Sequence, residues 1–373
     1  MKPIPFNKSS VQGNELKYIE QAIANGHLSG DGIFTYKCNT FLENELNVKK
    51  TLLTTSCTHA LEMAAILLDI KKGDEVIVPS YTFVSTVNAF VLRGAKPVFI
   101  DIHNDTLNLD ETLLEGLITK NTKAIIVMHY AGVGCEMDSI MKISKQYHIP
   151  VIEDNAHGLF GRYKGKYLGT FGAFSTQSFH DTKNFSCGEG GALFINEEKF
   201  IERARIIREK GTNRHRFLRG EVDKYTWVDI GSSFILSDIL AAFLYAQFEQ
   251  REIIRLKRKK IWDHYYANLE DWAIKSDIRL PLFPEYCEQT YHTFYLLMPS
   301  LEKRTAFIEH LKKNSINAVF HYLPLHLSKM GRKFGCKSGD CPITKDISER
   351  IVRLPLYNDL NIESLDFKCF YDF

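Results

Sequence analysis

The chain has 373 residues, of which 25% are charged, and its formal net charge at pH 7 is +2. This length accommodates a large domain together with a smaller one and is ample for a buried core. The near-neutral charge argues against a protein that coats nucleic acid, because such proteins usually carry a basic stripe, and the basic run RLKRKK at 255–260 is predicted to be a solvated helix face.

The N-terminal sequence MKPIPFNKSS has no apolar signal region, and no later segment approaches the length of a membrane span. The eight cysteines follow no regular framework, as expected for thiols that stay reduced. We therefore expect a cytoplasmic protein with no membrane partner.

From about residue 50 to residue 210, short runs rich in Val and Ile alternate with helical patterns. The runs are bounded by Gly, Pro and Asp, which is typical of buried parallel strands. We expect strands at TLLTTS, DEVIVPS, KPVFIDI, KAIIVMHY and IPVIEDNAH, and helices at HALEMAAILLDI, at 83–92, at LDETLLEGL and at MDSIMKISKQY. This α/β alternation predicts a mainly parallel sheet with right-handed crossovers.

The carboxyl ends of the predicted strands are where a ligand should bind, because parallel sheets bind ligands beyond those ends. The informative residues should therefore follow the apolar runs directly, in the stretches TTSCTHA, PSYTF, HYAGV, EDNAHG and SFHDTKN.

The sequence changes in character after residue 210. The stretch 211–233 is polar and aromatic and is expected to be a loop, and a long helical stretch follows at about 235–267. A strand (TYHTFYLLMP), a helix (EKRTAFIEHLKKN) and a second strand (NAVFHYLP) then predict a small α+β domain. We place the large domain at 1–248 and the small C-terminal domain at 249–373.

The stretch TTSCTHA leads from a strand into a helix, so that Ser56, Cys57 and Thr58 occupy the helix N-terminus. Free backbone N–H groups and the positive end of the helix dipole form an anion site there, suited to a phosphate. An ordinary Ser or Thr helix cap explains the same residues equally well.

Two carboxylates, Glu153 and Asp154, end the apolar run VIED. Since side chains alternate along a strand, only one of them can point into the cleft. There it could ligate a metal, act as a base or pair with a cationic ring nitrogen. A helix N-cap by Asp154 or Asn155 is the alternative.

Lys183 follows another apolar run, in the polar and glycine-rich stretch SFHDTKNFSCGEGG. Lysine forms Schiff bases with carbonyl compounds, although a lysine in an isolated loop is usually a surface residue. A phosphate site, a strand-end acid and a lysine at three strand ends of one sheet together describe a pocket for pyridoxal phosphate (PLP). Phe83, in PSYTF, could stack on the ring of this cofactor or pack in the core.

The remaining histidines and cysteines predict no metal site. His129 and His180 lie near strand ends and are expected to be hydrogen-bonded structural residues. Cys336 and Cys341, with histidines nearby, do not have the spacing of a zinc knuckle, and no second cysteine pair follows.

The combination of EDNAHG, SFHDTKNFSCGEGG and TTSCTHALEMAA resembles the DegT/DnrJ/EryC1/StrS family of sugar-nucleotide aminotransferases. The resemblance extends from HLSGDG at 27–32 to RLPLYNDL at 353–360. It implies the PLP-dependent transferase fold of type I, the aspartate aminotransferase-like α/β fold, with a large mainly parallel-sheet domain and a small C-terminal α+β domain.

The resemblance also implies roles for individual residues. Lys183 matches the catalytic lysine that bonds the aldehyde of the cofactor, and Asp154 matches the acid that pairs with its pyridine nitrogen. The other cofactor contacts within the subunit would be Phe83 on the ring face, His157 at the phenolic oxygen, and Cys57, Thr58 and Ser178 around the phosphate.

The family forms homodimers in which a loop of the neighbouring subunit also reaches the phosphate. Many members have Gly-x-Asn there, whereas this chain has Gly-Ser-Ser at 231–233, so that Ser233 takes the place of the asparagine. Arg214 and Lys224 lie in the segment that family dimers use at the shared cleft, and His321 and Tyr322 lie where the small domain would face the sugar. We expect these four residues to contact substrate.

The stretches LDIKKGDEVIVPSYTFVSTVNAFVLRGA, IIREKGTNR, DKYTWVDIGSS and AVFHYLPLH narrow the resemblance to members that act on TDP-4-oxo-6-deoxyglucose. It implies transfer of the amino group of L-glutamate to C4 of a TDP-4-oxo-6-deoxyhexose. The products would be 2-oxoglutarate and a TDP-4-amino-4,6-dideoxyhexose of galacto configuration, a building block of lipopolysaccharide O-antigen or enterobacterial common antigen.

Two alternatives stay open at this point. The first is transfer to C3 of the hexose, since motifs do not report how the sugar lies in the pocket. The second is a non-catalytic regulator on the same fold, although regulators often lack the lysine or its acid partner and this chain has both Lys183 and Asp154. The lysine also disfavours a dehydratase.

Overall fold

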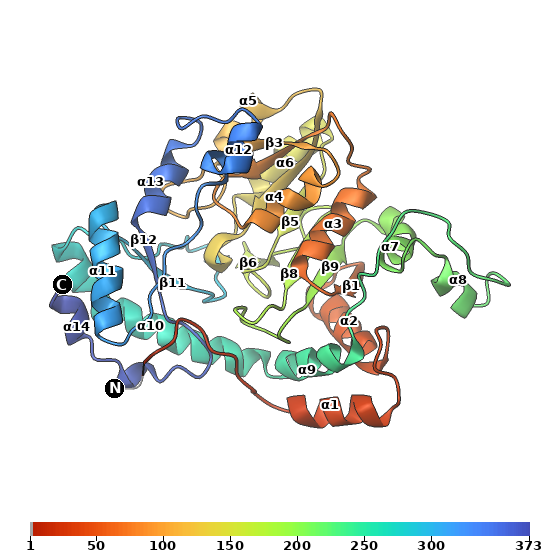
Figure 1. Cartoon of the computed structure of the whole chain (residues 1–373), viewed down its shortest axis with the longest axis horizontal. Coiled ribbons are helices and arrows are strands. Elements are labelled where there is room, and N and C mark those ends of the chain that lie inside the picture. Colours follow the sequence, from red (N-terminus) through yellow and green to blue (C-terminus); the bar gives the residue numbers. More distant parts are fainter. Residues whose placement is uncertain (1–2) are drawn as a thin grey trace.

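One large sheet forms the centre of the structure. The computed structural model describes residues 3–373, and within them seven strands pair in the order β1-β9-β8-β5-β4-β2-β3 (Figure 1). β9 runs antiparallel to its neighbours β1 and β8, and the other adjacent pairs are parallel, so the prediction of a mainly parallel sheet is confirmed. The strands are β1 (Lys50–Thr54), β2 (Glu75–Pro79), β3 (Lys96–Ile100), β4 (Thr122–Met128), β5 (Val151–Asp154), β8 (Phe174–Ser178) and β9 (Gly191–Ile195).

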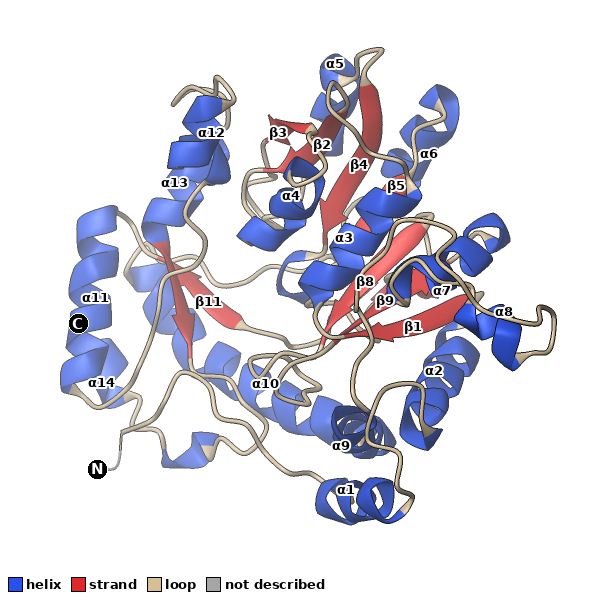
Figure 2. Cartoon of the chain, turned by 45° about the vertical axis from the view of Figure 1, so that its right-hand side comes forward, coloured by secondary structure: helices blue, strands red, loops and turns tan. Residues whose placement is uncertain are grey.

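Helices cover both faces of this sheet (Figure 2). They are α2 (Ile33–Leu46), α3 (Cys57–Leu67), α4 (Val84–Val91), α5 (Leu114–Leu117), α6 (Met137–Tyr147) and α7 (Ile201–Arg208). Along β4, Ala124 and Ile126 join the core under α3 and α4, while Ile125 and Val127 join the core under α6. Because successive side chains alternate between two buried faces, the strand reads as one continuous apolar run in the sequence.

The C-terminal part has a core of its own, built around a two-stranded sheet. The expected helix at 235–267 is two helices, α9 (Asp238–Glu249) and α10 (Arg251–Lys275), which meet at Gln250. Apolar side chains of α10 pack against β11 (Phe294–Leu297), α11 (Leu301–Lys313) and β12 (Ile351–Leu354). β11 and β12 are antiparallel neighbours, and α13 (Pro342–Arg350) leads into β12.

The prediction of a strand at NAVFHYLP is wrong. In this stretch only Val319 forms a β-bridge, an isolated one to Arg353, and β12 takes the place beside β11. Tyr322 has a positive φ of 21° and Pro324 has no N–H group, so the backbone turns away from the sheet after Val319. The turn directs His321 into the interior, where it is buried.

The expectation that 255–260 is a solvated helix face is wrong for Arg258, whose side chain is 2% exposed. Its guanidinium donates to the carbonyl oxygens of Tyr291, His292 and Leu356 and to Oδ1 of Asn358. These acceptors belong to two loops of the C-terminal part, whose positions a helical charge pattern does not reveal. The arginine therefore links α10 to both loops.

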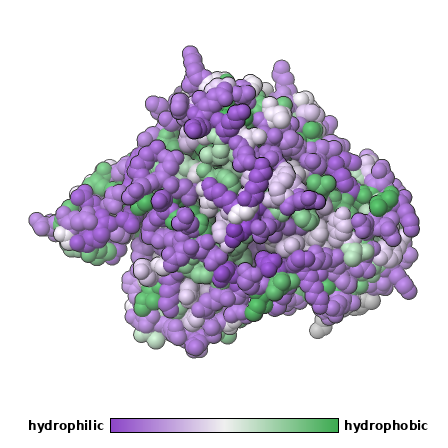
Figure 3. All heavy atoms as spheres, turned by 180° about the vertical axis from the view of Figure 1, so that it is seen from behind, coloured by the Kyte–Doolittle hydropathy of each residue, from purple (hydrophilic) through white to green (hydrophobic). Residues whose placement is uncertain are grey.

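Residues 209–233 project from the body of the molecule as an arm (Figure 1). The arm was expected to be a loop, but it contains the short helix α8 (Arg214–Leu218). Apolar side chains lie open to solvent on it, among them Tyr225 at 52% and Trp227 at 76% exposure, and Figure 3 shows apolar groups on this projection. An arm with exposed aromatic rings is typical of a protein-interaction surface.

The N-terminal residues lie against the C-terminal part of the chain. Ile4 pairs with Ile316 and packs on the same core as β11 and β12, although the proposed boundary assigns residues 1–248 to the large domain. That division stays a prediction. The remaining elements are α1 (Glu15–Ala24), β6 (Arg162–Tyr163), β7 (Lys166–Tyr167), β10 (Cys287–Glu288), α12 (Lys329–Lys333) and α14 (Lys368–Tyr371). Within residues 3–373, no helix is both long enough and apolar enough to cross a lipid bilayer.

Candidate active site

A cavity of about 600 Å³ lies where strand ends of the large sheet face the C-terminal part. It is lined by the residues that the sequence predicts for the cofactor, apart from Ser233, and by two of the predicted substrate residues. These lining residues are Cys57, Thr58, Phe83, Asp154, His157, Ser178, Lys183, His321 and Tyr322. The structure therefore brings together side chains from across the sequence, as the strand-end argument expects.

Asp154 is the last residue of β5, and its carboxylate is buried in the cavity wall. Oδ2 accepts a hydrogen bond of 2.7 Å from the Thr86 hydroxyl, and Oδ1 accepts one of 3.2 Å from the Ala156 N–H. Burial raises the pKa of this carboxyl, while the two donors and the charge of Lys183 act in the opposite direction. Among residues 3–373 no cationic nitrogen forms an ion pair with it, so the buried anion has room for a cationic partner.

Glu153 points to the other side of β5 and is a structural residue. Its carboxylate accepts hydrogen bonds from the backbone N–H groups of Gly169, Phe171 and Gly172, at 2.7 to 2.8 Å, and lies 3.0 Å from Nε2 of His129. Only one of the two neighbouring acids therefore faces the cavity, as the alternation of the strand predicts. His129 is the hydrogen-bonded structural residue that was expected.

Lys183 lies in the turn that follows β8, and its partly buried side chain lines the same cavity as Asp154. Desolvation lowers the pKa of its amine to about 8, although the nearby charge of Asp154 acts to raise it. A substantial fraction of the amine is therefore neutral near pH 8 and able to act as a nucleophile or a base.

The N-terminus of α3 forms another part of the cavity wall. Ser56 caps the helix, since its hydroxyl accepts a hydrogen bond from the N–H of His59. The cap leaves the N–H groups of Cys57 and Thr58 free of protein acceptors within residues 3–373. Gly191 of β9 permits this approach, because a Cβ there would collide with the backbone of Ser56 and Cys57. Both the cap and the anion site foreseen from the sequence are thus compatible with the structure.

A wall of imidazole and phenol rings closes the side toward the C-terminal part. The ring of His157 stacks on that of His292, and the ring of His321 stacks on that of Tyr322. Nδ1 of His321 is hydrogen-bonded to the Tyr130 hydroxyl at 2.8 Å, whereas Nδ1 of His157 is buried without a partner. Burial lowers the pKa of all three histidines well below the usual value, so the wall carries neutral imidazoles.

Phe83 stands at the N-terminus of α4, and its ring is 56% exposed. The ring lines the cavity and lies 6.4 Å from that of Tyr322. Packing in the core, the alternative reading of this residue, is therefore excluded, and one face of the ring remains available to a ligand.

Three predicted site residues do not reach the cavity of their own chain. Arg214 forms a 2.6 Å ion pair with Glu209 at the base of the arm, and Lys224 is exposed farther along it. Ser233 pairs with Glu209 through its backbone and is exposed. Their expected contacts involve a neighbouring subunit and stay predictions.

Several cavity residues were not expected from the sequence. They are Phe6, Asn7, His180, His292 and Arg353. Arg353 begins RLPLYNDL, a motif that carried the family resemblance, and this was the one available signal for it. His180 lies in SFHDTKN, one of the strand-end stretches, and was expected to be only a structural residue. Nothing in the local pattern marks Phe6, Asn7 and His292, because contacts between distant segments bring them to the cavity.

The N-terminal segment forms one edge of the cavity. The ring of Phe6 lies 4.7 Å from the guanidinium of Arg353, and the side-chain amide of Asn7 donates to the carbonyl of Asp181 at 3.0 Å. The Ser9 hydroxyl donates to the Asp181 carboxylate. This segment therefore connects β12 to the turn that carries Lys183.

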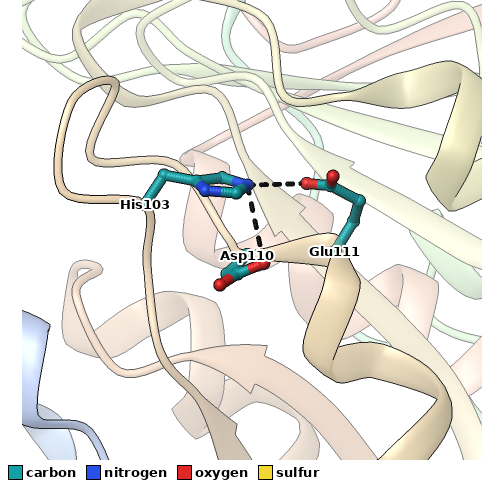
Figure 4. A group of neighbouring side chains, drawn as sticks. All are labelled: His103, Asp110 and Glu111. Atoms are coloured by element: carbon teal, nitrogen blue, oxygen red, sulfur yellow. Dashed lines mark hydrogen bonds and ion pairs between the residues drawn. The ribbon is translucent and has the colours of Figure 1, made fainter.

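A separate cluster of His103, Asp110 and Glu111 lies outside the cavity (Figure 4). Nε2 of His103 is 2.8 Å from Oε2 of Glu111 and 3.6 Å from Oδ1 of Asp110. Burial alone would lower the pKa of His103, but the bond to Glu111 and the charge of Asp110 raise it overall. A metal needs the lone pair of a neutral imidazole, so this arrangement favours an ion pair over a metal ligand set.

The cavity residues fit PLP. A buried carboxylate without an ion-pair partner suits a protonated ring nitrogen, and a partly neutral lysine suits an aldehyde. The free N–H groups at the start of α3 suit a phosphate. The unpartnered Nδ1 of His157 and the open face of Phe83 provide a polar contact and a stacking surface between these groups.

The chain is similar to known proteins over nearly its whole length. The model of the DegT/DnrJ/EryC1/StrS aminotransferase family matches residues 9–367. GDP-perosamine synthase of Escherichia coli O157:H7 is 31% identical over 373 residues, which cover 99% of this chain and 97% of that protein. The protein MJ1066 of Methanocaldococcus jannaschii is 38% identical over 334 residues, which cover 87% of this chain and 85% of that protein.

The solved structures of Spr1654 from Streptococcus pneumoniae have the same fold. The apo-form gives a TM-score of 0.91 at 27% identity and covers 99% of this chain and 96% of that chain. The PLP-form and the PMP-form of the same protein each give a TM-score of 0.90.

Proposed function

Since this chain belongs to the DegT/DnrJ/EryC1/StrS aminotransferase family, a family of PLP-dependent enzymes with the type I transferase fold, we propose that it moves the amino group of L-glutamate to C4 of a TDP-4-oxo-6-deoxyhexose. The products are 2-oxoglutarate and a TDP-4-amino-4,6-dideoxyhexose of galacto configuration. Family, fold and cofactor agree with the sequence-based predictions; the substrates and the position of transfer are the proposal.

The observation that carries this proposal is the presence of Lys183 and Asp154 in the wall of one cavity. A catalytic transaminase needs both groups at the same ligand, and a regulator does not. GDP-perosamine synthase, a relative over the full length of the chain, is named for a nucleotide-linked amino sugar, which supports a nucleotide-sugar acceptor.

We assign the cofactor contacts from the family resemblance, and all of the residues concerned line the cavity. Asp154 would hold the ring nitrogen, Phe83 would cover one ring face and His157 would contact the phenolic oxygen. The N–H groups of Cys57 and Thr58, together with Ser178, would hold the phosphate. When bound, PLP supplies an electron-accepting ring that stabilises negative charge on a carbon that has lost a proton.

Lys183 moves the proton in this scheme. Its lowered pKa leaves part of the amine neutral near pH 8, so Nζ can take the proton from the α-carbon of L-glutamate. For the sugar, the same atom returns a proton to C4 in the reverse sequence. Asp154, buried and held by Thr86 and Ala156, stays in place to stabilise positive charge on the ring nitrogen throughout.

The neutral ring wall provides the contacts for the sugar. A neutral imidazole both donates and accepts a hydrogen bond, and a phenol does the same, which matches the hydroxyl groups of a hexose. His321 and Tyr322 lie on this wall and line the cavity. We assign them to the sugar.

The arm completes the site in a homodimer. Its exposed aromatic side chains, including Trp227, call for a covering surface. With the arm on a second copy of the chain, Ser233 reaches the phosphate of the cofactor, and Arg214 and Lys224 reach the anionic groups of the substrates. We place this reaction in the cytoplasm, where its product would serve as a precursor of a surface glycan.

The test is to incubate the PLP-loaded protein with L-glutamate and TDP-4-oxo-6-deoxyglucose and to identify the product by NMR. An axial amino group at C4 leaves H4 equatorial, so small couplings from H4 to both H3 and H5 identify the galacto product. A TDP-3-oxo-6-deoxyhexose and a GDP-linked 4-oxo-6-deoxyhexose serve as parallel acceptors.

Three outcomes contradict the proposal. If only the 3-oxo sugar is aminated, the position of transfer is C3 rather than C4. If only the GDP-linked sugar is aminated, the nucleotide is GDP rather than TDP. A protein that remains colourless after addition of PLP favours a regulator.

A further inference from the structure

The ring of His321 has one nitrogen held by the protein and one that is open to the cavity. Nδ1 is hydrogen-bonded to the Tyr130 hydroxyl at 2.8 Å. Nε2 has no hydrogen-bond partner within residues 3–373 and, unlike Nδ1 of His157, is not occluded by protein atoms. Because His321 lines the cavity, Nε2 is the nitrogen that a ligand can reach.

The Tyr130 hydroxyl has a single proton, and a second tyrosine determines where that proton points. The hydroxyl of Tyr81 donates to that of Tyr130 over 3.4 Å, and their ring centroids are 5.1 Å apart. Among residues 3–373, Nδ1 of His321 is the only other hydrogen-bond partner of the Tyr130 hydroxyl. Tyr130 therefore donates to Nδ1. A neutral imidazole that accepts at Nδ1 carries its proton on Nε2, so His321 presents an N–H donor to the cavity.

His292, on the same cavity wall, has the opposite arrangement. Nδ2 of Asn184 donates to the carbonyl of Thr290 at 2.8 Å, and Oδ1 of Asn184 lies 2.9 Å from Nδ1 of His292. An amide oxygen only accepts, so Nδ1 of His292 carries the proton and its Nε2 bears a lone pair. The neighbours of each ring thus select its tautomer, and they select different ones.

We infer that Tyr130 is a positioning residue that fixes His321 as a hydrogen-bond donor to the carbonyl oxygen of the acceptor sugar. This inference rests on the proposed function, in which His321 contacts the sugar, and it names the group that is contacted. A carbonyl oxygen only accepts a hydrogen bond, whereas a hydroxyl pairs with either tautomer of an imidazole. A fixed N–H donor therefore favours an oxo sugar over the corresponding alcohol. Tyr130 is buried and does not line the cavity, so it acts through His321.

The first experiment measures the tautomer of His321 in the PLP-loaded protein without substrate. In protein labelled with nitrogen-15 in the histidine rings, a nitrogen that carries a proton and one that bears a lone pair have well-separated NMR shifts. The signals of His321 are those that His321→Gln lacks. We expect the proton on Nε2 in the wild type and a mixture of tautomers in Tyr130→Phe. A wild type with the proton on Nδ1 would overturn the inference.

The second experiment compares two ligands that differ only at C4, TDP-4-oxo-6-deoxyglucose and TDP-6-deoxyglucose. The PLP-loaded protein holds no amino group to transfer, so calorimetry measures binding without turnover. We expect the Kd of the oxo sugar to rise roughly 3- to 10-fold in Tyr130→Phe, the effect of one hydrogen bond. The Kd of the alcohol should change by less than about 2-fold, because its hydroxyl pairs with either tautomer.

Tyr295→Phe is the matched control. The ring of Tyr295 lies 6.0 Å from that of Tyr130 in the same buried cluster, but its hydroxyl is not bonded to Tyr130 or His321. Tyr295 does not line the cavity. This variant should keep the wild-type tautomer of His321 and both wild-type affinities. Circular dichroism and thermal unfolding establish that each variant is folded.

The outcomes distinguish positioning from a merely structural role. An equal loss of affinity for the oxo sugar and the alcohol in Tyr130→Phe would overturn the inference, and so would unchanged affinity for both. The reaction of the bound cofactor with L-glutamate, followed by visible absorption, involves no sugar and should be unaltered in this variant. If Tyr130→Phe weakens binding of the oxo sugar alone but the wild type does not aminate that sugar, the positioning role stands and the proposed transfer to C4 fails.

Discussion

The imidazole rings of His157 and His292 stack with their centroids 4.0 Å apart and their planes inclined by 22°. His292 is fixed in turn by a 2.9 Å hydrogen bond from Nδ1 to Oδ1 of Asn184, the residue that follows Lys183. The His157 ring, which we assign to the phenolic oxygen of the cofactor, is thus supported by the same turn that carries Lys183, the proposed catalytic lysine. His292 therefore acts as a positioning residue.

Replacement of His292 separates its two contributions. His292→Ala removes the stacking partner and the hydrogen bond to Asn184, whereas His292→Phe retains the stacking partner. We expect the Kd for PLP, measured by absorption titration, to rise about 10-fold in His292→Ala and less in His292→Phe. Equal affinity in all three proteins would show that the stack does not position His157.

Lys183→Ala should abolish both turnover and the visible absorption of the covalently bound cofactor. Proton transfer alone contributes about 10²–10⁴-fold to a rate, and this variant also loses the covalent attachment, so the decrease in kcat should exceed one such factor. The measurement combines steady-state kinetics with an absorption spectrum. Retention of both properties would place the nucleophile elsewhere.

Asp154→Asn should remain folded and bind PLP but lose most of its activity. An amide of the same shape can accept from Thr86, yet it carries no charge to stabilise the protonated ring nitrogen. We expect kcat to fall by about 100-fold or more, because the partner charge is buried. Near-normal transamination by this variant would contradict the assignment of Asp154.

The desolvated Lys183 amine should also affect the stability of the apoprotein. Burial lowers its folded-state pKa from the ordinary 10.5 to about 8, so between these pH values the unfolded state binds more protons than the folded state. The contribution of this lysine to stability therefore increases with pH across that window and is constant below it.

Lys183→Met removes this pH-dependent contribution. We expect the variant to be more stable than the wild type near pH 7, with an advantage that shrinks as the pH rises from 8 toward 10.5. Urea unfolding of both apoproteins at several pH values measures the difference, and groups that titrate alike in both proteins cancel. A difference that does not change with pH would mean that the amine is well solvated.

Arg258→Met should destabilise the fold without altering the chemistry. The variant leaves the carbonyls of Tyr291, His292 and Leu356 without their donor, and unsatisfied buried groups cost about 1–3 kcal/mol each. We expect the free energy of unfolding to fall by about 3 kcal/mol or more. Arg255→Met, on the exposed side of the same helix, should change it by less than about 0.5 kcal/mol.

Local sequence patterns predicted the strands whose formation depends on the residues within them. The Val- and Ile-rich runs became β2, β4 and β5, and residues that follow β2 and β5 became cavity walls, because parallel strands end at a common edge. The stretch HYAGV after β4 was expected there too, but it does not line the cavity. Local patterns did not predict which distant strands pair with one another. The antiparallel direction of β9 and the failure of NAVFHYLP to form a strand depend on which strands meet.

The same distinction holds within the site. Lys183 and Asp154 stand out because each ends or follows a buried strand. Arg258 resembles a surface residue in its helix, and only the folded chain shows the carbonyl groups that surround it. His292 and Arg353 come from the C-terminal part, whose packing against the sheet no short motif describes.

The N-terminal segment has a practical consequence. Because Phe6 and Asn7 form an edge of the cavity and Ile4 pairs with Ile316, a fusion partner or affinity tag at the N-terminus would be joined to a segment that lines the cavity. Phe373, at the other end, packs beside Phe307 on the core of the C-terminal part and is not among the residues that line the cavity. Recombinant protein for kinetic work is therefore better tagged after Phe373.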